Sequence, residues 1–363
     1  MLVSEPILYD SVKENKRKNV PQAINVWISY AYHNLPRGNL FLRCVDITNP
    51  LFFGMSDTAR VFINGGNGVT ELLHLCFRNH HIHDMPIQTR DIRLRWEYSL
   101  DNAVWNVSYE TNHLAYLALN PPRGPWFGRS VFVEYVQQTY PQVQGALTEA
   151  EVGQRIVNLI NTGMINHVQT FRYDNVQGAS RYLRMPGGNI DHMMIWNDIS
   201  GQNDAYPVVV NCLDCAAMVT LLSDIWGCNL RYMELFNGTH AADEFSCNAI
   251  IPVGFGDHEW QVPFGHGFSY HAVSVDVWGM ANNSQLKIYD ACLKVDAQAL
   301  PWEINNKQPL LPEGMAFSQY TPNPPPGNAP VPIDSYREHL CRGDANGACV
   351  TVIGLIHNYI RLL

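Results

Sequence analysis

The segment Leu213 to Ile225 carries almost no charge, and its apolar residues lie nearly all round a helix. Such a helix is expected inside a domain rather than on its surface. The three β-branched residues Val208 to Val210 come before it and predict a buried strand end, while Gly227 suits the stop of the helix. The pattern therefore predicts a strand that runs through Asn211 and Cys212 into a buried helix.

A second helix is predicted after Thr148, because Thr148 and Glu151 have the spacing of a capping box. An apolar stripe follows them, and Gly163 ends the pattern. A short helix or turn is predicted over Asp191 to Asn197. The residues of the stripe are Val152, Ile156, Leu159 and Ile160.

The first third of the chain alternates apolar and polar residues in short runs separated by Gly and Pro, which predicts a two-layer antiparallel β domain. The segment Val69 to Phe77 departs from this texture and is expected to form a short helix. The expected strands lie at Asn25 to Tyr32, Ile92 to Tyr98, Trp105 to Tyr109 and Val131 to Tyr135.

Two alternating runs, Tyr270 to Trp278 and Leu286 to Asp290, are separated by a short turn-like stretch and predict an antiparallel hairpin. If Val277 pairs with Ser284, His271 lies directly opposite Asp290, where paired side chains share one face of the sheet. Further strands are expected at Arg231 to Phe236 and, returning to the core, at Cys349 to Ile360.

Together these elements predict an α+β protein with a tail at 1–20, a β-rich, β-sandwich-like domain at 21–140, and a second domain at 146–363. The domain boundary is placed just before the helix that begins at Thr148. A Pro-rich stretch at 321–332 is expected to be a surface loop or extended linker of the second domain.

Composition narrows the class of protein. Of the 363 residues 46% are hydrophobic, as in a well-buried globular chain, and the net charge of −9 argues against nucleic acid as the main partner. No apolar run has the length of a membrane span, and no signal-peptide core follows Met1. We expect a protein without membrane insertion, cytoplasmic or exported without a cleaved signal peptide, with its nine cysteines mostly reduced.

Cys212 is the first candidate for a catalytic residue. At the first turn of a buried helix, the free N–H groups and the helix dipole favour a thiolate, which is a nucleophile. Cys212 and Cys215 also form a C-x-x-C pair, which leaves redox chemistry or half of a zinc site open. A separate metal site is conceivable at His81 and His83, whose spacing puts two imidazoles on one face of a strand.

A base for Cys212 is predicted at His271, because a carboxylate beside an imidazole fixes its tautomer and stabilises the imidazolium. Asp290 is placed to do this by the hairpin. A partly buried structural His–Asp pair is the alternative. His266, flanked by glycines before the strand, is the rival base.

The order of cysteine at a helix start, histidine on a strand and aspartate on the next strand resembles the transglutaminase-like branch of the papain-like cysteine enzymes. Around Cys212 the resemblance is local as well, and it covers roughly Thr148 to Val295. It departs from the family after the histidine, at Ala272 to Ser274. The residues at matching positions are Ala216, Ala217, Gly227, Arg231 and the pair Asp290-Ala291.

The resemblance implies acyl transfer from an amide, a protein glutamine side chain or a peptide bond, through a thioester on Cys212. It implies no cofactor; some members need calcium, but no calcium loop is legible here. Transglutaminase, deamidase and protease stay open, and the implied partners are a protein or peptide substrate and possibly a primary amine acceptor. Auxiliary oxyanion candidates are Trp196 and Gln202, by resemblance, and Asn211.

Two alternatives from other classes stay open. One is a non-catalytic binding module with this fold, and the other is a delivered toxin or effector that uses the β-rich domain for targeting.

Overall fold

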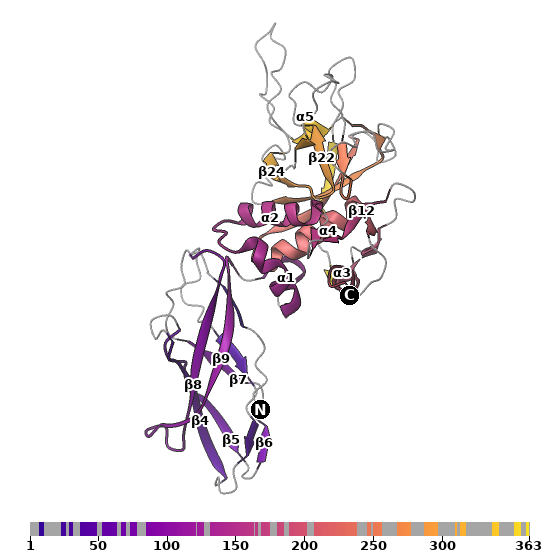
Figure 1. Ribbon diagram of the computed structural model, residues 1–363. Coiled ribbons are helices and arrows are strands. Elements are labelled where there is room, and N and C mark those ends of the chain that lie inside the picture. Colours follow the sequence, from indigo (N-terminus) through magenta and orange to yellow (C-terminus); the bar gives the residue numbers. More distant parts are fainter. Residues whose placement is uncertain are drawn as a thin grey trace. The chain divides into compact units, whose positions relative to one another are not determined.

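The computed structural model shows an α+β protein with two compact units, Met1–Pro121 and Pro122–Leu363 (Figure 1). Each unit is described by itself. The structure describes residues 7–10, 23–26, 29–31, 37–48, 53–63, 67–69, 73–77, 85–120, 122–126, 131–162, 164–165, 168–174, 180–184, 189–201, 207–237, 245–247, 250–255, 267–276, 287–296, 309–310, 313–316, 336–340, 352–356 and 361–362.

The first unit is built from strands. Its main sheet has the order β1-β9-β8-β4-β5, antiparallel except where β1 runs parallel to β9, and the pairs β2–β7 and β3–β6 form smaller antiparallel sheets. The strands are β1 Ile7–Asp10, β2 Ala23–Val26, β3 Ser29–Ala31, β4 Gly38–Asp46, β5 Ala59–Ile63, β6 Asn67–Val69, β7 Leu73–Cys76, β8 Gln88–Ser99 and β9 Asn106–Ala118.

The long hairpin β8–β9 confirms the strands expected from alternation at Ile92 to Tyr98 and after Trp105. Its turn is set by Asp101, whose Oδ1 accepts from the backbone N–H groups of Ala103 and Val104 at 2.8 and 2.9 Å. These hydrogen bonds lower the pKa of the Asp101 carboxyl to about 2. One core cluster collects the buried side chains of this unit: Cys44, Phe53, Leu75, Phe77, Ile92, Leu94, Trp96, Ala115 and Leu117.

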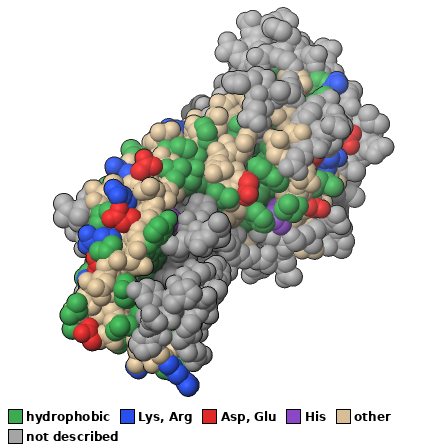
Figure 2. All heavy atoms as spheres, turned by 60° about the horizontal axis from the view of Figure 1, so that its bottom comes forward, with side chains coloured by type: hydrophobic (Ala, Val, Ile, Leu, Met, Phe, Trp, Pro, Cys, Tyr) green, Lys and Arg blue, Asp and Glu red, His purple; other side chains and the backbone are tan. Residues whose placement is uncertain are grey.

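On the face shown in Figure 2, side chains of both charge signs are interspersed. In the first unit, ion pairs place opposite charges side by side on the main sheet: Glu97 accepts from Arg43 of β4 at 2.6 Å and from Arg95 of its own strand, β8, at 2.8 Å, and Arg93 of β8 pairs with Glu110 of β9. Because opposite charges are adjacent there, this sheet surface does not present a field of one sign.

Two predictions for the first 140 residues are wrong. Leu73–Cys76, expected within a helix, is strand β7, because Leu75 and Phe77 alternate into the core while the backbone pairs with β2. The segment Val131 to Tyr135, expected as a strand, leads into helix α1, Val133–Val143. The buried positions of α1 are Tyr135, Val136, Thr139 and Val143, a helical spacing.

Because α1 packs on the next helix, it belongs to the second unit, and the division between the units falls at Pro121 rather than near 140. The helical elements of the second unit are η1 Gly124–Trp126, α1 Val133–Val143, α2 Glu149–Asn161, α3 His192–Ile199, α4 Cys212–Asp224 and α5 Tyr336–Leu340. None of the described helices is both long and apolar enough to cross a membrane.

The strands of the second unit are β10 Met164–Ile165, β11 Val168–Gln169, β12 Phe171–Tyr173, β13 Leu183–Arg184, β14 Asn189–Ile190, β15 Val208–Val210, β16 Leu230–Asn237, β17 Phe245–Ser246, β18 Ile250–Pro252, β19 Gly267–Phe268, β20 His271–Asp276, β21 Lys287–Tyr289, β22 Leu293–Asp296, β23 Pro309–Leu310, β24 Glu313–Ala316, β25 Val352–Ile356 and β26 Arg361–Leu362. The main sheet among them has the order β24-β21-β20-β16-β25, with every neighbouring pair antiparallel.

The prediction of a buried central helix is confirmed by α4, in which every residue is buried. It packs on β16 and β20 of the main sheet and on α2. A polar clamp fixes it: the Ser274 hydroxyl of β20 donates to the backbone oxygen of Ala216 at 2.8 Å and lies 2.6 Å from the Thr220 hydroxyl. The clamp joins the middle of β20 to the second and third turns of α4.

The other helix signals also hold. Thr148 and Glu151 form the capping box of α2 with both reciprocal hydrogen bonds, and Asp191 caps α3. The expected strands at Arg231 to Phe236 and near the end of the chain are β16 and β25, which pair with each other. The Pro-rich stretch at 321–332 lies outside the described residues.

Candidate active site

The first turn of α4 presents Cys212. Asn211 is the N-cap, and its side chain accepts from the N–H of Asp214 at 3.1 Å while Asp214 accepts from the N–H of Asn211 at 3.1 Å. This is a capping box with asparagine and aspartate in the two roles. Cys212 is the first helical residue and is only 4% exposed. The cap thus gives the thiol a fixed place at the positive end of the helix dipole.

Asp214 also fastens a second segment to this turn. Its carboxylate accepts from the Ser180 hydroxyl at 2.6 Å and from the backbone N–H groups of Arg181 and Tyr182 at 2.9 and 2.7 Å. Burial raises the pKa of the Asp214 carboxyl, and these hydrogen bonds oppose that shift. No local sequence pattern marks this role of Asp214, because Ser180 lies 34 residues away in the chain.

The same segment carries a bidentate ion pair. Arg181 donates from Nε and Nη2 to Asp198 of α3 at 2.6 and 3.0 Å, and the Tyr182 hydroxyl donates to Asp198 at 2.7 Å. Asp198 is almost fully buried, so its charge is compensated by these donors. The pair links α3 to the segment that Asp214 holds against α4.

The hairpin that was expected to bring His271 to Asp290 exists as β20 and β21, but its register differs from the prediction. Ser274 pairs with Tyr289 and Asp276 with Lys287, which is two residues away from the pairing of Val277 with Ser284. Since side chains alternate with period two, a shift of two residues leaves His271 and Asp290 on a common face. Their side chains meet, with 2.9 Å between His271 Nε2 and Asp290 Oδ2.

Asp290 is held by four donors. Its Oδ1 accepts from the N–H groups of Cys292 and Leu293 at 2.7 and 3.2 Å. Its Oδ2 accepts from His271 and from the hydroxyl of Tyr336, a residue of α5, at 2.9 Å each. The carboxylate is therefore fixed in one orientation. Tyr336 was not among the predicted site residues, and no local pattern in the sequence marks it.

His271 is fully buried, and burial opposes its charge. The Asp290 carboxylate, its hydrogen bond and the neighbouring Cys212 thiol outweigh burial and raise the pKa of His271 to about 10. The ring is therefore an imidazolium at neutral pH. Its Nδ1 is buried and makes no hydrogen bond to the described part of the chain, so this nitrogen is the one left to interact with the neighbouring Cys212 thiol.

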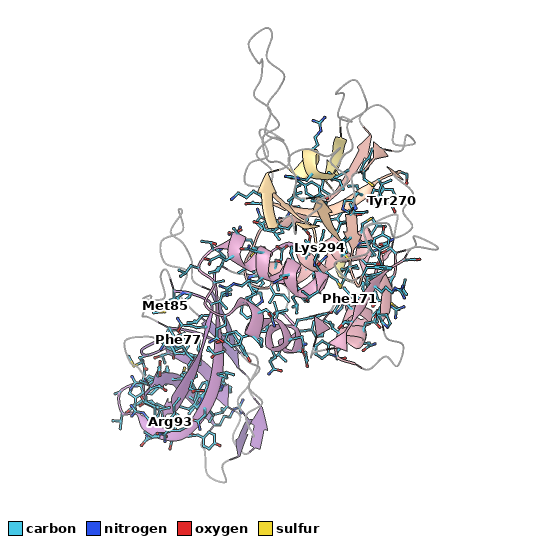
Figure 3. All side chains as sticks on the ribbon, turned by 45° about the horizontal axis from the view of Figure 1, so that its top comes forward. Phe77, Met85, Arg93, Phe171, Tyr270 and Lys294 are labelled. Carbon is cyan, nitrogen blue, oxygen red and sulfur yellow. The ribbon has the colours of Figure 1, made fainter. Side chains whose placement is uncertain are left out.

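Aromatic and thiol side chains enclose this group. Burial, followed by the proximity of Cys212, raises the pKa of Tyr173 of β12 and brings that of Tyr270, labelled in Figure 3 next to β20, to about 12. The Phe268 ring lies 5.4 Å from the His271 ring. Cys215 and Cys292 are fully buried free thiols whose pKa values are raised by burial. The surroundings favour a neutral reactant over a charged one.

The remaining predicted residues divide in two. Trp196 of α3 packs edge-on against Tyr135 at 5.7 Å, and Asn211 acts as the helix cap. His81, His83, Gln202 and the rival base His266 lie outside the described residues. Among the described residues, no group of three or more His, Cys, Asp or Glu side chains has an arrangement that could hold a metal ion.

Comparison with known proteins gives distant likenesses among solved structures alone. No protein-family model matches the chain, and no curated protein matches its sequence. Among solved structures, red sea bream transglutaminase is similar with a TM-score of 0.37 and 11% identity, over 80% of this chain and 50% of the other. The chain thus spans half the length of that structure.

Proposed function

We propose that this protein is a cysteine-dependent enzyme that transfers an acyl group from an amide through a thioester on Cys212. The observation that carries the proposal is the buried His271–Asp290 pair, 2.9 Å apart, beside a thiol at the capped N-terminus of α4. An imidazolium next to a thiol stabilises the thiolate, and a carboxylate behind it holds the ring in place.

In the proposed first step the Cys212 sulfur attacks the carbonyl carbon of the amide, so that a C–S bond forms and the carbonyl oxygen becomes an oxyanion. His271 then gives its Nδ1 proton to the departing nitrogen, and the C–N bond breaks. The backbone N–H of Cys212, at the end of a helix, is the donor we propose for the oxyanion. An amine or water next attacks the thioester and gives a proton to the now neutral His271; the C–S bond breaks, the acyl product leaves, and the thiolate and imidazolium are restored.

The sequence resemblance to transglutaminase-like enzymes supports a glutamine side chain or a peptide bond as the substrate class. The enclosing side chains of Tyr173, Tyr270 and Phe268 support an uncharged amide at the sulfur, since a charge would be costly in these surroundings.

The test is incubation of the purified chain with a glutamine-containing protein and a labelled primary amine. Amine incorporation that disappears in Cys212→Ala supports transfer to an amine, ammonia release without incorporation supports deamidation, and new chain termini support proteolysis. Cys215→Ala is the matched control, since it removes a buried thiol one turn further along the same helix. If none of the three activities depends on Cys212, the proposal is wrong.

A further inference from the structure

Tyr336 stands in an unusual position, because its hydroxyl shares one carboxylate oxygen with the proposed base. The hydroxyl donates to Asp290 Oδ2 at 2.9 Å, and the same oxygen pairs with His271 Nε2 at 2.9 Å. Tyr336 is fully buried and Asp290 is 1% exposed. Both side chains therefore lie away from bulk water.

The tyrosine reaches the site from a distant part of the chain. It is the first residue of α5, 46 residues beyond Asp290, and α5 packs beside β22, the strand that begins three residues after Asp290 (Figure 1). The Asp290 carboxylate thus accepts hydrogen bonds from two elements. The N–H groups of Cys292 and Leu293, at the start of β22, donate to one oxygen, and the Tyr336 hydroxyl of α5 donates to the other.

We propose that Tyr336 is a positioning residue of this site: its hydroxyl fixes Asp290 and limits how strongly Asp290 draws on His271. The inference rests on the proposed function. His271 Nε2 and the Tyr336 hydroxyl donate to the same oxygen, so each hydrogen bond is weaker than it would be without the other. Without the phenol, the carboxylate would pull the imidazolium away from the sulfur and towards itself.

Among the described residues, the main charges that act on His271 are those of Asp290 and Cys212, and the buried thiols of Cys215 and Cys292 lie near Asp290. Because both of those thiols are buried with raised pKa values, they are neutral near pH 7. A change at Tyr336 therefore reaches His271 through Asp290.

The experiment measures alkylation of Cys212 by iodoacetate and by iodoacetamide, resolved by peptide mass spectrometry, and so requires no substrate. An imidazolium beside the sulfur attracts the anionic reagent, so the ratio of the two rates reports the charge on His271. In Tyr336→Phe we expect alkylation at pH 7 to slow by about threefold to tenfold, which matches the net contribution of one ordinary hydrogen bond. The pH at which the ratio falls should move upward.

Two controls separate positioning from a structural effect. Tyr289→Phe removes the hydroxyl of a buried tyrosine that does not donate to Asp290, and should leave both rates unchanged. In an Asp290→Asn background, Tyr336→Phe should have almost no further effect, because the two changes interrupt one path. Equal effects of Tyr336→Phe in both backgrounds, or no effect in either, overturn the inference.

If Tyr336→Phe does not fold, 3-fluorotyrosine placed at position 336 keeps the ring and strengthens the donor. The pH at which the ratio falls should then move downward, and an unchanged pH overturns the inference. His271→Ala separates the two proposals. If it leaves Cys212 alkylation unchanged, the proposed thiol–imidazole pair fails, and the inference fails with it. If it slows alkylation and Tyr336→Phe does not, only the inference fails.

Discussion

Replacement of Asp290 by Asn tests the electrostatic basis of the proposed site. The pKa of His271 is about 10, against an ordinary value of 6.5, and the main favourable causes are the charge and hydrogen bond of Asp290. The difference of about 3.5, at about 1.36 kcal/mol for each pKa unit, corresponds to about 5 kcal/mol of preference for the imidazolium. The amide keeps the shape of the carboxylate but removes its charge.

In Asp290→Asn burial becomes the dominant cause, and the pKa of His271 should fall below 6.5. At pH 7.5 the ring would then be neutral, and the ratio of iodoacetate to iodoacetamide alkylation at Cys212 should be lower than in the wild type. Turnover of an amide substrate should drop by orders of magnitude, because the ring would have the wrong protonation state and tautomer.

The matched control is Asp276→Asn, at the end of β20 that is far from His271, where the carboxylate is partly exposed and is not among the main groups that act on His271. It should leave the ratio unchanged. An Asp290→Asn protein that is folded and still shows the wild-type ratio up to about pH 9 would refute the assignment of Asp290 as the source of the imidazolium charge.

Three further predictions concern stability. The pKa of His271 is higher in the folded state than in the unfolded state. Its contribution to the free energy of unfolding is therefore complete below about pH 6.5 and is lost as the pH rises to about 10. Unfolding in urea at several pH values should show this loss in the wild type but not in Asp290→Asn. Asp214→Ala leaves several buried N–H and O–H donors without an acceptor and should lower the free energy of unfolding in urea by about 3–5 kcal/mol. Ser180→Ala removes one of these donors and should lower it by only about 1 kcal/mol. Gly124→Ala would place a Cβ 1.9 Å from Asp224 Oδ2 at a φ of +55°, and a fall of less than about 2 kcal/mol in the free energy of unfolding would contradict this steric conflict.

Local signals predicted those elements whose residues carry the whole pattern themselves. The segment at α4 is apolar all round, so no strand competes with the helix, and the capping box of α2 lies within four residues. A strand was wrongly predicted at the start of α1, because the alternation of Val131, Val133 and Tyr135 spans only five residues and does not extend into the rest of the segment. The helix buries Thr139, a polar residue whose hydroxyl donates to the Tyr135 backbone oxygen and accepts from Trp226 Nε1 at 2.9 Å.

The contacts that complete the site could not be predicted because they join residues far apart in sequence. Asp214 holds Arg181 and Tyr182, and Tyr336 holds Asp290, across separations of 32 to 46 residues. Each partner is an ordinary tyrosine, arginine or backbone amide in its own segment. Only the folded chain shows that the donors converge on two buried carboxylates.

The pairing of His271 with Asp290 survived a register error because of the period of the strand. The predicted and observed pairings differ by two residues, and side chains two apart on a strand lie on the same face. An error of one residue would have placed the imidazole and the carboxylate on opposite faces. Parity therefore decides whether the two groups can meet, whereas the 2.9 Å contact itself depends on the backbone N–H groups of Cys292 and Leu293, which orient the Asp290 carboxylate. It follows that an insertion of one residue between β20 and β21, if it shifts the register of β21 by one residue, should abolish the imidazolium at Cys212.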